Sequence, residues 1–118
     1  MLSTDRTTIQ LPFYNQLVTL RTQIYNTPDQ VWKIDSIADS LNLSASYFQH
    51  TYKKLFGISV INDVIASRIS HGKKLLSGTN FSIKKIAHLC GYEYDVYFMR
   101  QFKNYTGLTP KEYRNSNI

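Results

Sequence analysis

The chain has little cysteine and no long apolar run, the features on which small secreted and membrane-spanning proteins depend. It contains a single cysteine, which excludes an internal disulfide and agrees with a reducing cytosol. No run of about 18 apolar residues is present, so no transmembrane helix is expected. The first residues also lack the basic and apolar regions of a secretory signal. We therefore predict a cytoplasmic protein that makes no contact with a membrane.

Residues able to perform catalysis or to bind metal are also few, and their spacing is unsuitable. Cys90 and His88 are two apart on a predicted helix and so point in different directions. His50 and His71 have no carboxylate or second ligand at metal spacing. No phosphate-binding glycine loop or paired-carboxylate motif occurs. We predict that the protein is not an enzyme, that it needs no cofactor or metal, and that Cys90 is a small core residue.

Acidic residues are scarce, and their distribution is uneven. The net charge is +6 in 118 residues, and 42% of the residues are hydrophobic, enough for one compact domain or two small lobes. Residues 45–118 carry 11 Lys or Arg against 4 Asp or Glu, whereas residues 1–44 carry 3 against 4. A basic surface on the second part of the chain is what binding to a polyanion requires, although many basic proteins bind no nucleic acid.

The stretch from Ser82 to Arg114 has the pattern of two helices joined by a tight turn. Ser82 is a predicted N-cap, and Gly91 occupies the place of a left-handed C-cap. Apolar residues at helical spacing give each helix an inner face: Ile83, Ile86, Ala87 and Cys90 on the first, and Phe98, Phe102 and Tyr105 on the second. The second helix has a basic outer stripe, a layout typical of a DNA-reading helix-turn-helix.

The same unit occurs earlier in the chain. Ile37 and Ala38 align with Ile86 and Ala87 at an offset of 49 residues. After the turn the offset becomes 50, and four residues align with equivalents of the same type: Tyr47, Phe48, Lys53 and Gly57 with Tyr97, Phe98, Lys103 and Gly107. Such a self-match indicates a duplicated supersecondary unit. In the first copy, Asn42 is predicted in the turn and Ser44 as the N-cap of the second helix.

The remaining segments suggest how the two units are connected. Residues 1–12 are polar and predicted to be a linker, and a helix is expected from Pro12 to about Asn26. Val31 and Trp32 are interpreted as a packing plug, with nucleic-acid stacking as the alternative for Trp32. A connecting helix over about 60–77 places these residues inward: Ile61, Val64, Ile65, Ile69, Leu75 and Leu76. Arg68, Lys73 and Lys74 are expected on its polar side. Thr109 and Pro110 begin a last helix, and residues 115–118 form a tail.

Two predicted outer stripes carry side chains suited to reading base edges. On the first, Gln49 can form two hydrogen bonds to adenine, and His50 can donate to guanine, while Ser46 lies on the same stripe. On the second, Arg100 can donate two bonds to guanine O6 and N7, and Val96 and Met99 can touch thymine methyls. Asp95 and Glu93 either accept from cytosine or only weaken non-specific binding. The alternative for each residue is a solvated face without a partner.

Lysines near these stripes are predicted to bind phosphates. Lys53, Lys54 and Lys103 follow the reading positions, which favours contacts to the DNA backbone. Lys73, Lys74, Lys84 and Lys85 fit either phosphate contacts or plain surface. A helical protein-interaction module would explain the helices but not the duplicated basic stripes. An RNA-binding module is a further alternative, although most of the aromatic residues fall on inner helical faces.

These motifs resemble the DNA-binding domain of the AraC/XylS family of bacterial transcription regulators. The resemblance covers about residues 13–114 and is carried by IADSLNLSASYFQHTYKKLFGIS, SRISHGKKLL and IAHLCGYEYDVYFMRQFKNYTGLTPKEYR. It implies an all-α fold of seven helices, with helix-turn-helix lobes at about 13–59 and 82–114 joined by a long central helix. It implies double-stranded DNA as partner, with Ser46, Gln49 and His50, then Asp95, Val96, Met99 and Arg100, as readers.

Two residues differ from the usual family pattern, and the resemblance also implies further domains and partners. Asp95 and Val96 stand where the family more often has small polar residues or Gln. Many family members carry an N-terminal sensor, dimerisation or receiver domain, so the chain is expected to be the C-terminal output domain of a longer regulator. RNA polymerase is a candidate partner on the same grounds.

Overall fold

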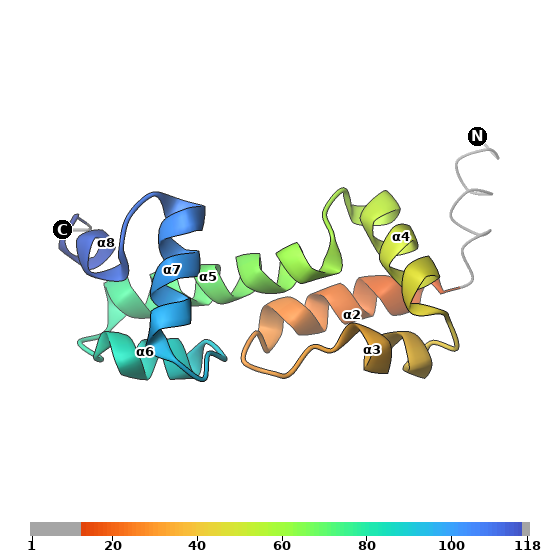
Figure 1. The fold of residues 1–118 in the computed structure, drawn as a ribbon, viewed down its shortest axis with the longest axis horizontal. Helices are drawn as coiled ribbons and strands as arrows, with labels where there is room; N and C mark the ends of the chain where they lie inside the picture. Colours follow the sequence, from red (N-terminus) through yellow and green to blue (C-terminus); the bar gives the residue numbers. More distant parts are fainter. Residues whose placement is uncertain (1–12, 117–118) are drawn as a thin grey trace.

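The computed structural model describes residues 13–116, which form seven α-helices and no strand (Figure 1). The helices are α2 (Tyr14–Asn26), α3 (Ile34–Ser40), α4 (Ala45–Phe56), α5 (Val60–Gly78), α6 (Ile83–Leu89), α7 (Asp95–Thr106) and α8 (Pro110–Ser116). The predicted all-α, seven-helix fold is confirmed. Two predicted segments lie outside the described residues: the linker, residues 1–12, which includes the predicted helix start at Pro12, and residues 117–118 of the tail. α8 extends to Ser116 and so includes the first two tail residues.

The long helix α5 runs through the middle of the molecule and joins two lobes. α2, α3 and α4 surround its first half, and α6, α7 and α8 surround its second half (Figure 1). The molecule is therefore elongated, with principal extents of 51 × 31 × 20 Å. α4 and α7 lie at opposite ends of α5, and both stand across its axis rather than along it (Figure 1).

Each lobe has its own hydrophobic core. In the first, α2 contributes Leu17, Leu20 and Ile24, and these pack with buried residues from the next three helices: Ala38, Phe48, Tyr52, Val60 and Val64. In the second, α5 contributes Ile69 and Leu76 to a core completed by Ile86, Ala87, Cys90, Tyr92, Phe98 and Phe102. Different turns of α5 thus face different cores, which explains how one helix can hold both lobes.

Close contact between α5 and α7 depends on a glycine. A Cβ atom added at Gly72 would lie 2.9 Å from Cε1 of Phe98 and 3.6 Å from Sγ of Cys90. The ring of Phe98 therefore occupies the space that any larger residue at position 72 would need. Cys90 is fully buried at this contact, and burial raises the pKa of its thiol to about 12. This confirms the prediction that Cys90 is a core residue.

The two repeated units begin and end their helices at equivalent positions. α3 and α6 are offset by 49 residues, and α4 and α7 by 50. Asn42 and Gly91 have positive φ in the two turns, and Gly57 and Gly107 have positive φ after α4 and α7. The duplicated unit and its change of offset are therefore confirmed, because residues with a left-handed backbone follow corresponding helices at equivalent positions.

The predicted serine caps at Ser44 and Ser82 form, and Ser59 caps α5 in the same way. Each serine hydroxyl accepts a backbone N–H from the third residue that follows, at 3.1 to 3.2 Å. Thr109 and Glu112 form a reciprocal capping box at the start of α8: the Thr109 N–H donates to the Glu112 carboxylate, and the Glu112 N–H donates to the Thr109 hydroxyl. The backbone hydrogen bond from Thr109 lowers the pKa of Glu112.

Three apolar residues are more exposed than predicted. Val31, interpreted as part of a packing plug, is 77% exposed, and only Trp32 packs against the first core. Ile61, predicted inward, is 55% exposed because Val60 and Val64 define the buried side of that turn of α5. Tyr105, assigned to the inner face of α7, is 46% exposed, and its hydroxyl lies 3.4 Å from Oδ1 of Asn62.

Candidate functional site

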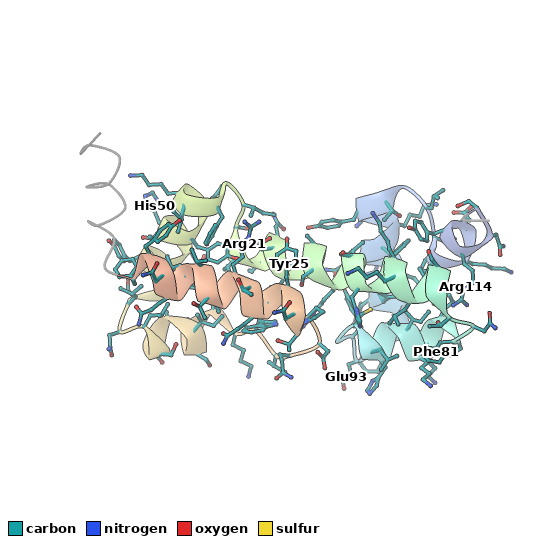
Figure 2. The ribbon with its side chains drawn as sticks, turned by 180° about the vertical axis from the view of Figure 1, so that it is seen from behind. Arg21, Tyr25, His50, Phe81, Glu93 and Arg114 are labelled. Atoms are coloured by element: carbon teal, nitrogen blue, oxygen red, sulfur yellow. The ribbon has the colours of Figure 1, made fainter. Side chains whose placement is uncertain are left out.

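α4 separates an aromatic inner face from a polar outer face. Phe48 and Tyr52 are fully buried, and their rings meet edge to face with centroids 6.0 Å apart. Ser46, Gln49 and His50 are all exposed, as the sequence predicted. Figure 2 shows His50 at the outer edge of the first lobe, away from the core. Within residues 13–116, the outer face of α4 is therefore accessible to a ligand.

α7 repeats this division with different outer residues. Phe98 and Phe102 are fully buried, whereas Val96 is 47% and Met99 37% exposed. Arg100 is also exposed, and its guanidinium lies over the ring of Tyr97 at 5.9 Å from the centroid. Asp95, the first residue of α7, is only partly exposed. The predicted second set of readers thus shares one face of α7, with Asp95 at its start.

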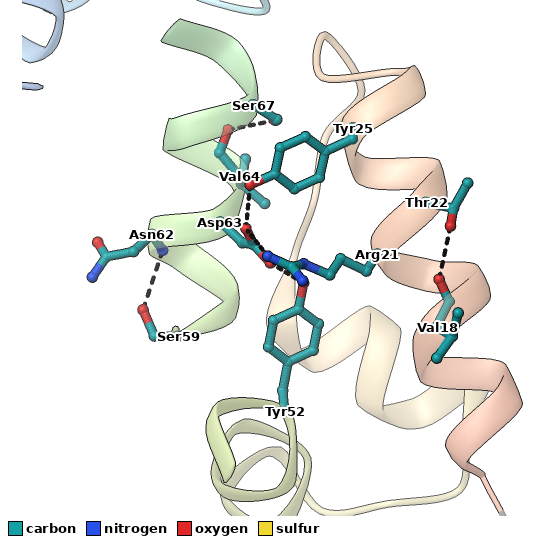
Figure 3. A network of polar contacts seen from close by, with 10 residues as sticks. All are labelled: Val18, Arg21, Thr22, Tyr25, Tyr52, Ser59, Asn62, Asp63, Val64 and Ser67. Carbon is teal, nitrogen blue, oxygen red and sulfur yellow. Dashed lines mark hydrogen bonds and ion pairs between the residues drawn. The ribbon is translucent and has the colours of Figure 1, made fainter. Parts of the chain in front are cut away.

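A buried carboxylate fixes α4 against α2 and α5. Asp63 on α5 has no exposed surface and accepts hydrogen bonds from the Arg21 Nε at 2.7 Å, the Tyr25 hydroxyl at 2.5 Å and the Tyr52 hydroxyl at 2.6 Å (Figure 3). Arg21 and Tyr25 come from α2, and Tyr52 comes from the inner face of α4. Three helices therefore meet at one carboxylate.

The charge of Asp63 is maintained by these partners. Burial by itself would raise the pKa of Asp63, but the hydrogen bonds from Arg21, Tyr25 and Tyr52 outweigh it, and the net pKa is lowered. The bond to Asp63 raises the pKa of Arg21, and burial raises the pKa of Tyr52. At neutral pH the network consists of an ionised carboxylate, a guanidinium and two neutral phenols.

A second polar contact orients α7. The Tyr92 hydroxyl, in the turn before α7, donates to Oε1 of Gln101 on the helix itself. Tyr92 is 7% exposed, and its ring packs against Phe98 with centroids 5.4 Å apart. Burial raises the pKa of Tyr92 to about 12. Because Gln101 follows Arg100 directly, this bond restrains the part of α7 that carries the predicted reader.

The predicted phosphate-binding lysines are all exposed, and they lie on four different helices. Lys53 and Lys54 lie in the last turn of α4, and Lys103 lies in the last turn of α7. Lys84 and Lys85 are in α6, where the Lys85 ammonium lies 4.0 Å from the centroid of the Phe81 ring.

Lys73 and Lys74 are separate from these, on α5. Gly72 faces Phe98 of α7, and at about 100° per residue Lys74 lies roughly 200° round the α5 axis from Gly72. Lys74 therefore projects from the side of α5 that is turned away from α7. Phosphate contact and plain surface both stay predictions for Lys74.

Two arginines have structural contacts that the spacing did not predict. Arg68, expected on the polar side of α5, is partly buried and donates to the carbonyls of Pro28 at 2.9 Å and Gln30 at 3.0 Å. Arg114 donates to the carbonyls of Leu76 and Thr79 at the end of α5. Their acceptors are 35 to 40 residues away in the chain. Both arginines lie in motifs that carry the family resemblance, Arg68 in SRISHGKKLL and Arg114 in the last motif, but neither motif indicated these acceptors.

The fold and the two outer faces together define a helix-turn-helix DNA-binding domain. Each copy has a short first helix, a turn with a left-handed residue, and a second helix that buries rings and exposes polar side chains. In helix-turn-helix domains generally, the second helix is the one that enters a groove of DNA. This chain has two such units on one connecting helix.

The chain belongs to the AraC/XylS family of DNA-binding transcription regulators. A family model described as a helix-turn-helix domain matches residues 37–116. The chain is 37% identical over 86 residues to the arabinose operon regulatory protein of Escherichia coli K12, and 33% identical over 85 residues to the xylose operon regulatory protein of the same strain. These matches cover 73% and 72% of this chain but 30% and 22% of those proteins, so the chain spans under a third of their length.

Solved structures show the same fold. The C-terminal domain of AraT, a response regulator from Geobacillus stearothermophilus, superposes with a TM-score of 0.79 at 30% identity, covering 85% of this chain and 84% of that one. The DNA-binding domain of AdpA, solved with a target DNA, gives a TM-score of 0.75 at 20% identity, with 86% and 89% covered.

The family consists of transcription regulators rather than enzymes. Within residues 13–116 there is no cluster of three or more potential metal ligands, and no helix has the length and hydropathy of a membrane span.

Proposed function

We propose that the domain binds duplex DNA by placing α4 and α7 in two segments of the major groove on one face of the duplex. The duplicated geometry supports this proposal most directly. α4 and α7 each have twelve residues, end at a left-handed glycine, bury two aromatic rings and expose a polar stripe. The long dimension of 51 Å exceeds the roughly 34 Å of one DNA turn, so two successive groove segments are within reach.

The proposed readers differ between the two helices. On α4, Gln49 offers an amide for adenine, His50 a donor for guanine acceptors, and Ser46 a hydroxyl that suits either. On α7, Arg100 offers a fork of donors for guanine, and Val96 and Met99 offer apolar contact for thymine methyls. Asp95 would accept a hydrogen bond from the amino group of cytosine. It is partly buried and is the least exposed of the proposed readers.

Replacing Arg100 with alanine is expected to weaken binding to the preferred sequence by about 1–3 kcal/mol and to relax selectivity at one base step. The reason is that the guanidinium can pair with two guanine acceptors at once, whereas a methyl group cannot. Fluorescence anisotropy with a set of duplexes, each changed at one base pair, measures both effects. Lys111→Ala is a matched control, because it removes one exposed positive charge from α8. Equal weakening on every duplex would identify Arg100 as a phosphate contact.

Affinity is expected to fall steeply with salt. If lysines such as Lys53, Lys54 and Lys103 contribute to about six phosphate contacts, the logarithm of the association constant falls with the logarithm of salt concentration at a slope near −5. Lys53→Ala should make the slope less steep by about one, because one fewer counterion is released. Lys74→Ala should leave the slope unchanged, since Lys74 projects away from α7. A reduced slope for Lys74→Ala would identify it as a phosphate contact.

One comparison separates this function from the alternatives. Binding of the same chain to a duplex selected from a random pool, to single strands and to structured RNA is expected to favour the duplex. Preference for single strands or RNA would contradict the proposal. RNA polymerase and an N-terminal sensor, dimerisation or receiver domain in a longer regulator remain predictions from the family resemblance.

A further inference from the structure

The two lobes meet at a junction beside the middle of α5. On the side of the first lobe lies the loop between α2 and α3, which contains Pro28, Asp29 and Gln30. On the side of the second lobe lies the turn between α6 and α7, which contains Gly91 and Tyr92. A cleft of about 280 Å³ adjoins this junction and is lined by residues of both lobes.

Arg68 contacts both sides of the junction. Its Nε donates to the Pro28 carbonyl at 2.9 Å, and its Nη2 donates to the Gln30 carbonyl at 3.0 Å. The same guanidinium lies 5.4 Å from the centroid of the Tyr92 ring. A planar guanidinium can make forked hydrogen bonds and stack on a ring at the same time, which an ammonium cannot do. Arg68 is therefore shared between a loop of one lobe and the turn of the other.

The backbones of the two lobes also come close together here. A Cβ atom added at Gly91 would lie 2.9 Å from the Cα of Asp29 and 3.2 Å from the Cζ of Arg68. Gly91 additionally has φ of +95°, which side chains other than glycine adopt with strain. The turn of the second unit is therefore seated directly on the loop of the first lobe, with Arg68 beside the contact.

Contacts then lead from this junction to the proposed reading face. Tyr92, under the Arg68 guanidinium, donates its hydroxyl to Gln101 and packs against Phe98, both on α7. Gln101 is the neighbour in sequence of Arg100, the proposed guanine reader. A second contact links α7 to the first lobe. The Tyr105 hydroxyl of α7 lies 3.4 Å from Oδ1 of Asn62, at the surface near the start of α5. The Arg68 junction has shorter hydrogen bonds and is partly buried.

We propose that Arg68 is a positioning residue, which fixes the orientation of α7 relative to the first lobe and thereby sets the separation of the two DNA segments that the domain binds together. The DNA consequence rests on the proposed function. Two linked binding units gain most in affinity when their link matches the span between their sites. A domain with a loosened junction should bind each segment as before but tolerate altered spacing between them.

The first test needs no DNA. Spin labels placed at Ser46→Cys on α4 and Asn104→Cys on α7, two exposed positions, report the distribution of distances between the helices by pulsed dipolar spectroscopy. The native Cys90 can stay, since it is fully buried and its thiol pKa of about 12 leaves little reactive thiolate.

Arg68→Met is expected to broaden the distribution of distances between α4 and α7. Ile69→Val, which trims the second core but leaves Arg68 and its hydrogen bonds in place, is the control and should keep the distribution narrow. An unchanged distribution in Arg68→Met would overturn the inference, whatever happens on DNA.

The second test measures tolerance to spacing. The two segments are defined on a selected duplex as the base pairs at which Gln49→Ala and Arg100→Ala lose discrimination, and two base pairs are then inserted between them. The unsubstituted domain is expected to lose about a hundredfold in affinity, because the second lobe can no longer engage. Arg68→Met should lose about tenfold or less, Arg68→Lys should fall between, and Ile69→Val should behave like the unsubstituted domain.

The outcomes of the two tests separate the inference from the proposed function. A broadened distribution with full spacing discrimination in Arg68→Met would overturn the role of Arg68 in setting the DNA spacing. Absence of two separable segments, or of any spacing preference, in the unsubstituted domain would overturn the proposed function instead. Broadening together with relaxed spacing, in Arg68→Met but not in Ile69→Val, would support the inference.

Discussion

Replacing Arg21 with methionine is expected to lower the free energy of unfolding by about 3 kcal/mol at neutral pH. The substitution leaves the Asp63 carboxylate fully buried without its cation, with only the hydroxyls of Tyr25 and Tyr52 to hold it. Breaking a buried ion pair by removing one partner costs about 3–5 kcal/mol in other proteins. The lower end applies here because two hydrogen bonds remain. Urea unfolding followed by circular dichroism measures the loss.

The pH dependence of this effect has a definite sign. In the unsubstituted domain the pKa of Asp63 lies below its ordinary value of 3.8, so the stability that this group contributes is present above about that pH. It is lost as the pH falls through the lower folded-state value. In Arg21→Met the effect of burial dominates, and the pKa of Asp63 should rise above 3.8. The penalty should therefore be largest near pH 7 and shrink as the pH falls through the raised pKa.

Lys54→Met is the matched control for this experiment. It replaces an exposed cation on α4 with the same side chain and should change the free energy of unfolding by less than about 0.5 kcal/mol at any pH. A loss for Arg21→Met as small as that of the control would show that the tyrosine hydroxyls alone stabilise the carboxylate. A loss that stays constant between pH 7 and pH 4 would contradict the predicted rise in the pKa of Asp63.

Replacing Phe98 with alanine is expected to cost about 3–5 kcal/mol and to unfold the second lobe before the first. The Phe98 ring is fully buried between Tyr92 and Phe102, with centroid distances of 5.4 and 5.5 Å, and it lies directly against Gly72 of α5. Because position 72 has no side chain that could move into the space, the cavity would remain largely open. Hydrogen exchange should show loss of protection in α6 and α7 with protection retained in α2.

The neighbouring Tyr97 provides the contrast. Tyr97 is 51% exposed on the outer side of α7, so Tyr97→Ala should leave the free energy of unfolding nearly unchanged. Its effect should be on DNA binding, because its ring lies against the Arg100 guanidinium. A Phe98→Ala variant that remained fully folded but changed sequence preference would mean that the inner and outer faces of α7 were assigned the wrong way round.

Much of the local structure could be predicted because its causes are local. Ser44, Ser59 and Ser82 cap helices with their own hydroxyls, and Gly57 and Gly107 end helices because glycine adopts positive φ without strain. These signals act within a few residues, so the helix bounds and the duplicated unit followed from spacing alone. The buried rings of α4 and α7 followed from helical periodicity, and the motifs identified the family.

Other features depended on which residues lie opposite each helix face. Helical spacing placed Arg68 with Lys73 and Lys74 on a polar side, but only the docked loop at Pro28 and Gln30 makes Arg68 a partly buried donor. The buried role of Asp63 has no local sequence pattern, because its hydrogen-bond partners lie 11 to 42 residues away in the chain. Ile61 and Tyr105 have apolar or aromatic side chains, yet the packing leaves them 55% and 46% exposed.

The sequence by itself thus determined the helices, their order, the repeat and the membership of a DNA-binding family, because caps, turns and periodicity are encoded within one or two helical turns. The tertiary structure decided which charged residues hold the lobes together and which remain available for DNA. Periodicity gives the direction of a side chain around its own helix axis. Whether that direction meets water, a carbonyl group or a buried carboxylate depends on the packing of segments far apart in the chain.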